Sequence, residues 1–339
     1  MSADLHRCFA AAAFALLVAA PLEAQSYHVA QTYTLGGDGG WDYVTLDTVG
    51  HRLFVARSDR VMVIDPANGK LVSEIPGLNR AHGVAFSYAT GKGFATSGGD
   101  SSVVVFDLKT LKVLGRTTAA DDADAVLFDP ATKHVFTFNG DAASSSVIDA
   151  ASGQRIGNID LGGKPEFGVS TGDGKLFVNI EDSSAVVEVD AAAMKVTRRW
   201  SLAPCEAPTG LALDRAHGLL FSGCRSGVMA VSDAKAGKLI TTVPIGQGVD
   251  AARFDPATQL AFASNGDGSI TVIHEDAPDK FTVVQTVQTK RGARTMELDL
   301  KTHRLFTVSA DFGPAPAPTA ERPRPPILPG TFALLELDP

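Results

Sequence analysis

The stretch 251–273, AARFDPATQLAFASNGDGSITVI, decides the fold because its pattern returns along the whole chain. A short apolar strand leads into the turn 255–258, a second strand carries Phe262, and a third strand follows the polar loop 265–268. The Phe marker recurs with spacings of 40 to 44 residues, at Phe54, Phe94, Phe136, Phe177, Phe221, Phe262 and Phe306. A repeat of this period indicates stacked units, none of which can bury its apolar face alone.

Each repeat holds room for a fourth, outer strand, such as 281–287 in the sixth. The segments are short, β-branched and separated by turn residues, which is typical of an all-β chain. Seven units of four antiparallel strands predict a seven-bladed β-propeller. The seventh repeat offers only 295–300, 305–309 and 332–337, so the N-terminal segment 27–35 is predicted to complete it. That strand would close the ring and remove an exposed edge.

Residues 1–24 differ from the rest of the chain. Arg7 precedes the apolar run 8–20, and the pattern predicts a secretory signal peptide cleaved near Ala24-Gln25. The alternative is a membrane anchor, but the run is short for a span. We therefore expect one propeller domain over 25–339, without a membrane span after cleavage, in the periplasm or secreted.

The 339 residues carry a formal charge of −8 without a Lys/Arg run, which argues against nucleic-acid binding. The sequence contains no phosphate loop, dinucleotide fingerprint or haem motif. An active site would therefore have to be assembled from separate blades. We expect the protein to be a monomer.

When the seven repeats are aligned, the residue type varies at one position. Five residues before the turn, at the entrance of each first strand, stand polar residues that we call the seven-residue ring. They are Asp42, His82, Asp124, Glu166, Thr209, Asp250 and Arg294. First strands line the central channel of a propeller, so we expect the ring at one mouth of this channel.

The chemistry of the ring allows several functions. His82, Asp124 and Glu166 on successive blades are candidate ligands for a divalent metal ion, Ca²⁺, Mg²⁺ or Zn²⁺. The same three are candidate catalytic residues, as a general acid/base group. Arg294 could clamp a carboxylate or phosphate. Alternatively, Arg294 neutralises its acidic neighbours and the ring only holds water, with no cofactor.

Other residues on the same face extend the candidate binding site. Tyr43 follows a ring residue, and polar residues end several second strands. The predicted ligand-binding residues are Asp42, Tyr43, Arg57, Asn139, Thr209, Asp250, Asn265 and Arg294. The insert 314–329 holds seven prolines and is predicted to be a surface loop of the seventh blade on this face. It could shield the channel or meet a partner.

Cys205 and Cys224 are the cysteines left after removal of the leader. An even count in an exported chain favours a disulfide, and the repeat places both cysteines on one face of the fifth blade. A free thiol pair or a metal pair is the alternative. A bond would close a loop of about 20 residues and contribute about 3 kcal/mol.

The chain resembles the YVTN (YncE-like) β-propeller repeat family over essentially its whole mature length. The resemblance rests on DPAT at 129–132 and 255–258, LFVN at 176–179 and VIDPANGK at 63–70. The Tyr of the family tetrad is Phe in every repeat here. The resemblance implies an exported propeller and no particular catalytic set. From the seven-residue ring, we expect a protein that binds a small molecule or an extracytoplasmic protein at the channel mouth. The alternatives are a lyase or lactonase-like hydrolase at the same mouth, or a protein–protein scaffold that uses its loop tips.

Overall fold

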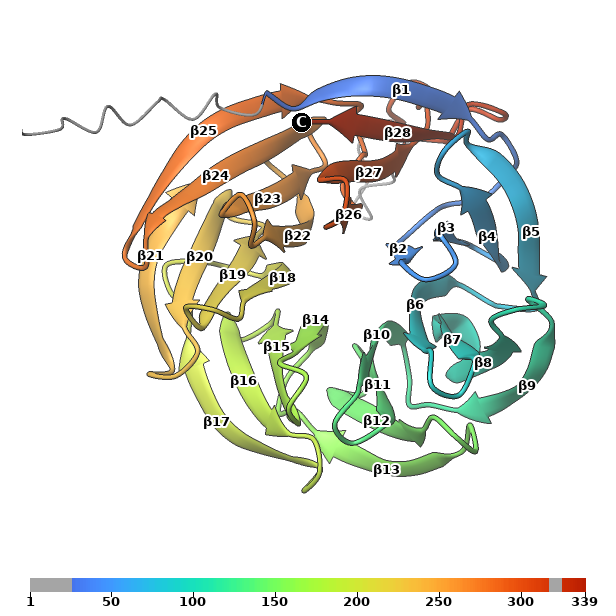
Figure 1. The fold of residues 1–339 in the computed structure, drawn as a ribbon, viewed down its shortest axis with the longest axis horizontal. Helices are drawn as coiled ribbons and strands as arrows, with labels where there is room; N and C mark the ends of the chain where they lie inside the picture. The colour runs from blue at the N-terminus through green and yellow to red at the C-terminus, as the bar shows by residue number, and fades with distance from the viewer. Residues whose placement is uncertain (1–25, 317–324) are drawn as a thin grey trace, which may run out of the picture.

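The computed structural model describes residues 26–316 and 325–339. Within them, the strands form seven four-stranded antiparallel sheets, blades 1 to 7, arranged around a central axis (Figure 1). The predicted seven-bladed propeller is therefore confirmed. The predicted signal peptide, 1–24, lies outside the described residues.

The blades follow one another along the chain, and the strands of each blade are named in order from the central axis outward. Blade 1 has β2 (Val44–Asp47), β3 (Arg52–Arg57), β4 (Arg60–Asp65) and β5 (Lys70–Pro76); blade 2 has β6 (Ala81–Ser87), β7 (Lys92–Ser97), β8 (Ser102–Asp107) and β9 (Val113–Thr118); blade 3 has β10 (Ala123–Asp129), β11 (His134–Asn139), β12 (Ser144–Asp149) and β13 (Arg155–Asp160); blade 4 has β14 (Pro165–Ser170), β15 (Lys175–Ile180), β16 (Ala185–Asp190) and β17 (Lys195–Ser201). Blade 5 has β18 (Pro208–Asp214), β19 (Leu219–Cys224), β20 (Val228–Asp233) and β21 (Lys238–Pro244); blade 6 has β22 (Val249–Asp255), β23 (Leu260–Asn265), β24 (Ser269–Ala277) and β25 (Lys280–Gln288); blade 7 has β26 (Met296–Asp299), β27 (Arg304–Ser309), β28 (Ala333–Asp338) and β1 (His28–Thr34). A single 3-10 turn, η1 (Gly98–Asp100), is the one helical element of the described chain. Nowhere in the described ranges is there a helix long and apolar enough to span a membrane.

The Phe markers hold neighbouring blades together. All seven lie in second strands and are buried. Phe54 meets Phe86 of blade 2 with ring centroids 4.9 Å apart, and Phe221 stacks on Phe254 of blade 6 at 5.1 Å. Aromatic pairs of this kind add stabilisation beyond the area they bury. The fixed place of Phe in the repeat thus reflects packing between blades.

The aspartates that end several first strands cap the turns that follow. The buried Asp47 carboxylate accepts hydrogen bonds from the backbone N–H of Val49 at 3.2 Å and of Gly50 at 2.9 Å. Asp129, Asp214 and Asp255 accept from their own turns in the same way. Such side-chain bonds favour a tight turn, which explains the turn signal of the repeat.

The N-terminal strand closes the propeller, as predicted. β1 pairs antiparallel with β28, with His28 opposite Asp338 and Thr34 opposite Ala333. Tyr27 is buried beside Phe262 of blade 6, with ring centroids 5.0 Å apart. The N-terminal strand therefore covers the free edge of β28 and also contacts the preceding blade.

The predicted disulfide between Cys205 and Cys224 is confirmed. Cys205 lies in the loop that enters blade 5, Cys224 ends β19, and both are buried.

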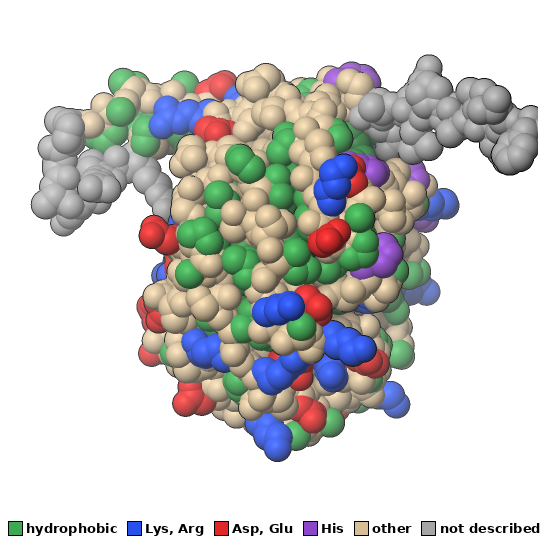
Figure 2. Space-filling model, turned by 90° about the vertical axis from the view of Figure 1, so that its left-hand side faces the viewer, with side chains coloured by type: hydrophobic (Ala, Val, Ile, Leu, Met, Phe, Trp, Pro, Cys, Tyr) green, Lys and Arg blue, Asp and Glu red, His purple; other side chains and the backbone are tan. Residues whose placement is uncertain are grey.

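On the outer wall where β21 and β25 lie, positive and negative side chains stand close together among hydrophobic ones (Figure 2). That side of the described molecule offers no surface of a single charge.

Candidate functional site at the channel mouth

Most ring residues sit where the first strand leaves its regular pairing. In blades 2 to 6 the register between first and second strand shifts around the ring position. The shifts fall between Ala81 and Val84, Ala123 and Val126, Pro165 and Gly168, Pro208 and Leu211, and Val249 and Ala251. Irregularities of this type re-aim side chains and are common beside functional sites. In blades 1 and 7, the ring residues Asp42 and Arg294 precede β2 and β26.

The backbone at the ring is fixed by bonds between blades. The N–H of Tyr43 donates to the carbonyl of His82 at 3.2 Å, and Ala251 N–H donates to the Arg294 carbonyl at 3.1 Å. The Thr295 hydroxyl donates to the Asp42 carbonyl at 2.9 Å. At these three places, one blade thus positions the ring residue of its neighbour.

Six of the seven ring residues line one cavity of about 810 Å³ at the channel mouth. These six are Asp42, His82, Asp124, Glu166, Asp250 and Arg294. Thr209 is buried outside the cavity wall, and its hydroxyl lies 2.9 Å from the Val249 carbonyl and 3.2 Å from that of Gly223. Its side chain therefore joins blades 5 and 6.

Of the other predicted binding residues, Tyr43 lines the cavity, whereas Arg57, Asn139 and Asn265 are buried away from its wall. The Arg57 guanidinium lies 3.6 Å from the centroid of the Phe332 ring and donates to a backbone carbonyl. Both asparagine amides donate to hydroxyls of their own blades at 3.1 to 3.2 Å. The two asparagines thus hold neighbouring strands together, and Arg57 contacts the segments that precede β2 and β28.

His82 lies at the centre of a hydrogen-bonded group. Its Nδ1 bonds to Asp42 and lies 3.2 Å from Asp124 Oδ1, and its Nε2 accepts from Arg80 Nε at 3.1 Å. Gly98 of η1 makes room for the His82 imidazole, because a Cβ at that position would stand 2.8 Å from Nε2. The geometry holds the imidazole firmly within the cavity.

Opposing effects set the protonation of His82. Burial lowers its pKa, but the hydrogen bond to Asp42 and the charges of Asp124 and Asp42 outweigh burial, so the pKa is raised overall. The bond from Arg80 Nε requires a neutral ring with its proton on Nδ1. A shift of the exposed Arg80 side chain would free Nε2 for a proton, so His82 can act as a base.

Two neighbouring carboxyl groups favour the protonated form. Burial raises the pKa of Asp124 to about 7, and the surrounding carboxylates add to this despite the opposing effect of His82. Burial raises the pKa of Glu166 to about 9, helped by its hydrogen bond to Glu181. Tyr43, whose pKa is raised well above its usual range by burial and the acids around it, also keeps its proton. Near neutral pH, the cavity therefore contains hydrogen-bond donors as well as acceptors.

The structure adds four residues that the sequence reasoning missed. Arg80, Lys164, Arg225 and Arg291 line the outer part of the cavity, and we call them the rim cations. Lys164 Nζ lies 2.8 Å from Glu181 Oε2 and 3.7 Å from Glu166 Oε1. Arg80 and Lys164 stand two residues before ring members, just ahead of β6 and β14, so reading that second column would have found them.

The wall formed by blades 1 and 7 is more apolar. Trp41 packs against Phe312 with ring centroids 6.0 Å apart, and Phe312 forms an isolated β-bridge with Ile327. Trp41, Phe312, Pro325 and Ile327 all line the cavity. The described C-terminal part of the Pro-rich insert thus reaches the channel mouth, while 317–324 lie outside the described residues.

The possible metal ligands gather somewhat differently from the predicted set. Ligand atoms of Asp42, His82 and Asp124 lie within 4.8 Å of one another. Glu166 instead faces Glu181, Lys164 and Arg225. One imidazole and two carboxylates suit a divalent cation, with Asp42 in the place predicted for Glu166.

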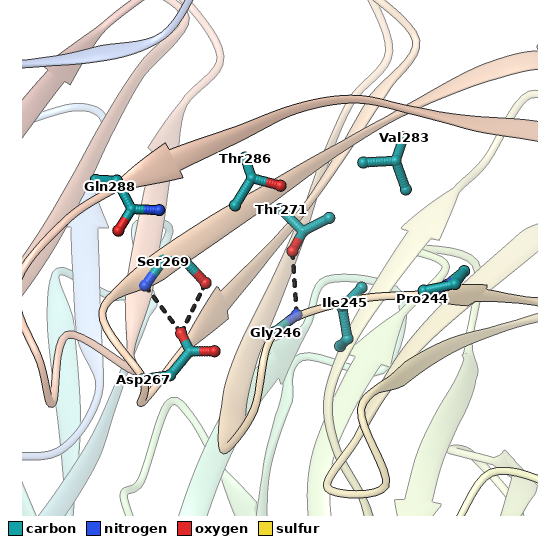
Figure 3. A pocket seen from close by; sticks show the side chains of 9 residues that line it. All are labelled: Pro244, Ile245, Gly246, Asp267, Ser269, Thr271, Val283, Thr286 and Gln288. Atoms are coloured by element: carbon teal, nitrogen blue, oxygen red, sulfur yellow. Dashed lines mark hydrogen bonds between the residues drawn. The ribbon is translucent and has the colours of Figure 1, made fainter.

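A second hollow, of about 600 Å³, lies between blades 5 and 6 (Figure 3). Its polar groups largely bind each other. The N–H and hydroxyl of Ser269 donate to Asp267, and Gly246 N–H donates to the Thr271 hydroxyl at 3.2 Å. It holds fewer free polar groups than the channel mouth and is the weaker candidate.

No family model matches the sequence, and no curated protein matches it. Among solved structures, the chain is similar to hydrazine synthase from Kuenenia stuttgartiensis, with a TM-score of 0.51 and 15% identity. The match covers 71% of this chain and 97% of that chain. Likeness at this identity supports the β-propeller fold and carries no function.

Proposed function

We propose that the protein binds a small organic anion with an apolar part at the mouth of its channel. The observation that carries this proposal is the cavity of about 810 Å³, whose wall combines rim cations, protonated acids and aromatic side chains. Binding sites for small molecules typically occupy about 300–1,000 Å³ and pair apolar walls with a few polar groups.

Each part of the wall has a role in this proposal. The rim cations attract and hold a carboxylate or phosphate. Protonated Asp124 and Glu166 donate hydrogen bonds to it. Trp41 and Phe312 contact the apolar part of the ligand. Three kinds of contact within one cavity favour an amphipathic acid over a metal ion alone.

The test is a thermal-shift screen with aromatic and aliphatic carboxylates, sugar acids and phosphates, because a ligand of the native state raises its melting temperature. The strongest hit is then titrated by calorimetry. Arg291→Ala should weaken binding by about tenfold or more, whereas Lys238→Ala on outer strand β21 should not. Equal affinity in both variants would overturn the proposal.

A second candidate function is catalysis by a lyase or lactonase-like hydrolase. It is favoured by the Asp42–His82 pair, which resembles a general base with its orienting carboxylate, beside Glu166, whose pKa is raised by burial to about 9. Under this reading, His82→Ala abolishes turnover of lactones or sugar acids. Binding of the product should persist in that variant.

We also infer that the protein acts outside the cytoplasm as a monomer of the YVTN (YncE-like) type. The buried Cys205–Cys224 bond is compatible with an oxidising compartment, and the pattern of 1–24 supports export. Cell fractionation with N-terminal sequencing tests this inference. A scaffold role through the loop tips remains the alternative, and deletion of 314–329 should abolish partner capture only under that role.

A further inference from the structure

A second cluster of possible metal ligands lies at the far end of the strands from the channel mouth. Asp214 ends β18, His217 follows in the turn, and Glu275 comes from β24 of blade 6. The ligand atoms of all three lie within 4.8 Å of one another. His217 Nδ1 is 2.7 Å from Asp214 Oδ2 and 2.6 Å from Glu275 Oε1.

Glu275 is an unusual member of this cluster. Its side chain is 1% exposed, and neither carboxylate oxygen has an aligned hydrogen-bond partner, despite the short distance to His217. Burial of a carboxylate is unfavourable unless it is paired or coordinates a metal. The carboxylate is aimed into the cluster, so the cluster is where that compensation has to come from.

The charges of the cluster do not balance by themselves. Among the described residues, His217 is the one basic side chain within 4.0 Å of Asp214 or Glu275. A protonated His217 would still leave one negative charge, whereas a divalent cation with a neutral imidazole would balance both carboxylates. Burial and the nearby Asp214 also raise the pKa of Glu275, as expected for a carboxylate without a sufficient counter-charge.

We propose that Asp214, His217 and Glu275 form a divalent-cation site between blades 5 and 6. One imidazole nitrogen and two carboxylate oxygens suit Zn²⁺, which binds such mixed sets. The His217 side chain is 38% exposed, so the ion can enter from solvent. A bound ion would join the two blades at the end opposite the ligand cavity.

Blade 7 supplies a matched control. His303 follows Asp299 in the corresponding turn, and its Nδ1 bonds to Asp255 of blade 6 at 2.6 Å. Among the described residues, no third acid joins this pair in a metal-ligand group. His303 therefore occupies the corresponding turn and bonds to one acid, Asp255, but should not bind the ion.

The experiment is calorimetric titration of the chelator-treated full chain with ZnCl₂. It is done in the His82→Ala background, because His82 belongs to the other possible ligand group. We expect one Zn²⁺ per chain, with affinity at least about tenfold lower after either His217→Ala or Glu275→Gln and unchanged after His303→Ala.

A thermal-shift series reads the same site in another way. Zn²⁺ should raise the melting temperature of the His82→Ala chain but not that of His82→Ala/His217→Ala, in which an exposed side chain is changed. Absence of Zn²⁺ binding in the His82→Ala chain would overturn the proposal. So would binding that survives His217→Ala. Either result would leave His217 as a protonated partner of the two acids.

Discussion

At the residue scale, Asp124 is held in a place that disfavours its charge. Its pKa is raised by burial to about 7 in the folded protein, against about 4 in an unfolded chain. The folded state therefore binds this proton more tightly, and the free energy of unfolding falls as pH rises from about 4 through 7. Asp124→Asn should remove that loss and stabilise the protein more at pH 8 than at pH 5, by about 1–3 kcal/mol.

Urea unfolding of wild type and variant at the two pH values measures this difference. Asp279→Asn, in an exposed turn, is the control. An Asp124→Asn effect of equal size at both pH values would contradict the prediction.

The same carboxyl should make ligand binding depend on pH. An anion in the cavity favours protonated Asp124, whose pKa is raised by burial to about 7. The dissociation constant should therefore rise with pH above 7, by up to about tenfold per pH unit for one linked proton. Calorimetry from pH 6 to 8 checks this slope, which should disappear in Asp124→Asn. A dissociation constant that falls with rising pH would contradict it.

Much of the site could be predicted because each residue of the seven-residue ring occupies the same aligned position in its repeat. Alignment identifies polar positions, but it does not separate side chains that face the channel from those that join blades. Thr209 is of the second kind, since its hydroxyl bonds to blade 6, whereas the Asn265 amide bonds within its own blade. Arg225 and Arg291 lie in loops, where no shared register exists to reveal them.

At the element scale, the loop that enters blade 5 is tied to β19 by the Cys205–Cys224 bond, with a sequence separation of 19. The double variant Cys205→Ser/Cys224→Ser should lose about 3 kcal/mol, mainly because the unfolded chain gains freedom. Chemical unfolding of oxidised wild type and the variant gives the difference. Reduced wild type should match the variant, and equal stability of all three would contradict the prediction.

The turn η1 is an element that serves one side chain. A Cβ on Gly98 would stand 2.8 Å from His82 Nε2, so Gly98→Ala should displace the imidazole. We expect weaker ligand binding with a modest loss of stability. Gly91→Ala, where nothing lies within 4 Å of the added carbon, is a control for a loop glycine, although its φ of +66° adds local strain. A variant that binds like wild type would contradict this role for η1.

The strands themselves were largely predictable, since period-two patterns and turn residues mark them. β24 was the exception. The expected third strand ended at 273, whereas β24 continues to Ala277 and pairs with a nine-residue β25. Pairing with a longer outer strand extends it, and no local pattern announces such pairing. For that reason, Glu275 was not singled out.

At the scale of the whole molecule, closure depends on β1. Deletion of 26–34 would leave the edge of β28 without its partner, and an unpaired edge invites association between chains. We expect a lower melting temperature and the appearance of oligomers by light scattering. Gln31→Ala, on the exposed side of β1, should remain like wild type. A deleted chain that stays monomeric and equally stable would contradict this.

The propeller as a whole could be predicted because the same unit occurs seven times. A strand that is unclear in one repeat is identified by comparison with the other repeats. The incomplete seventh repeat even indicated its partner strand. The function had no such redundancy, because it rests on single residues such as His82 that occur once.

The β1–β28 pairing also determines how the molecule would respond to mechanical load. His28 faces Asp338, so the start of β1 and the end of β28 lie at the same end of the pair. Force applied between these two positions would open the hydrogen bonds one after another, as a zipper opens, instead of shearing them together. In optical tweezers, blade 7 should open first and at low force. The propeller is therefore weakest under tension at the β1–β28 pair that closes it.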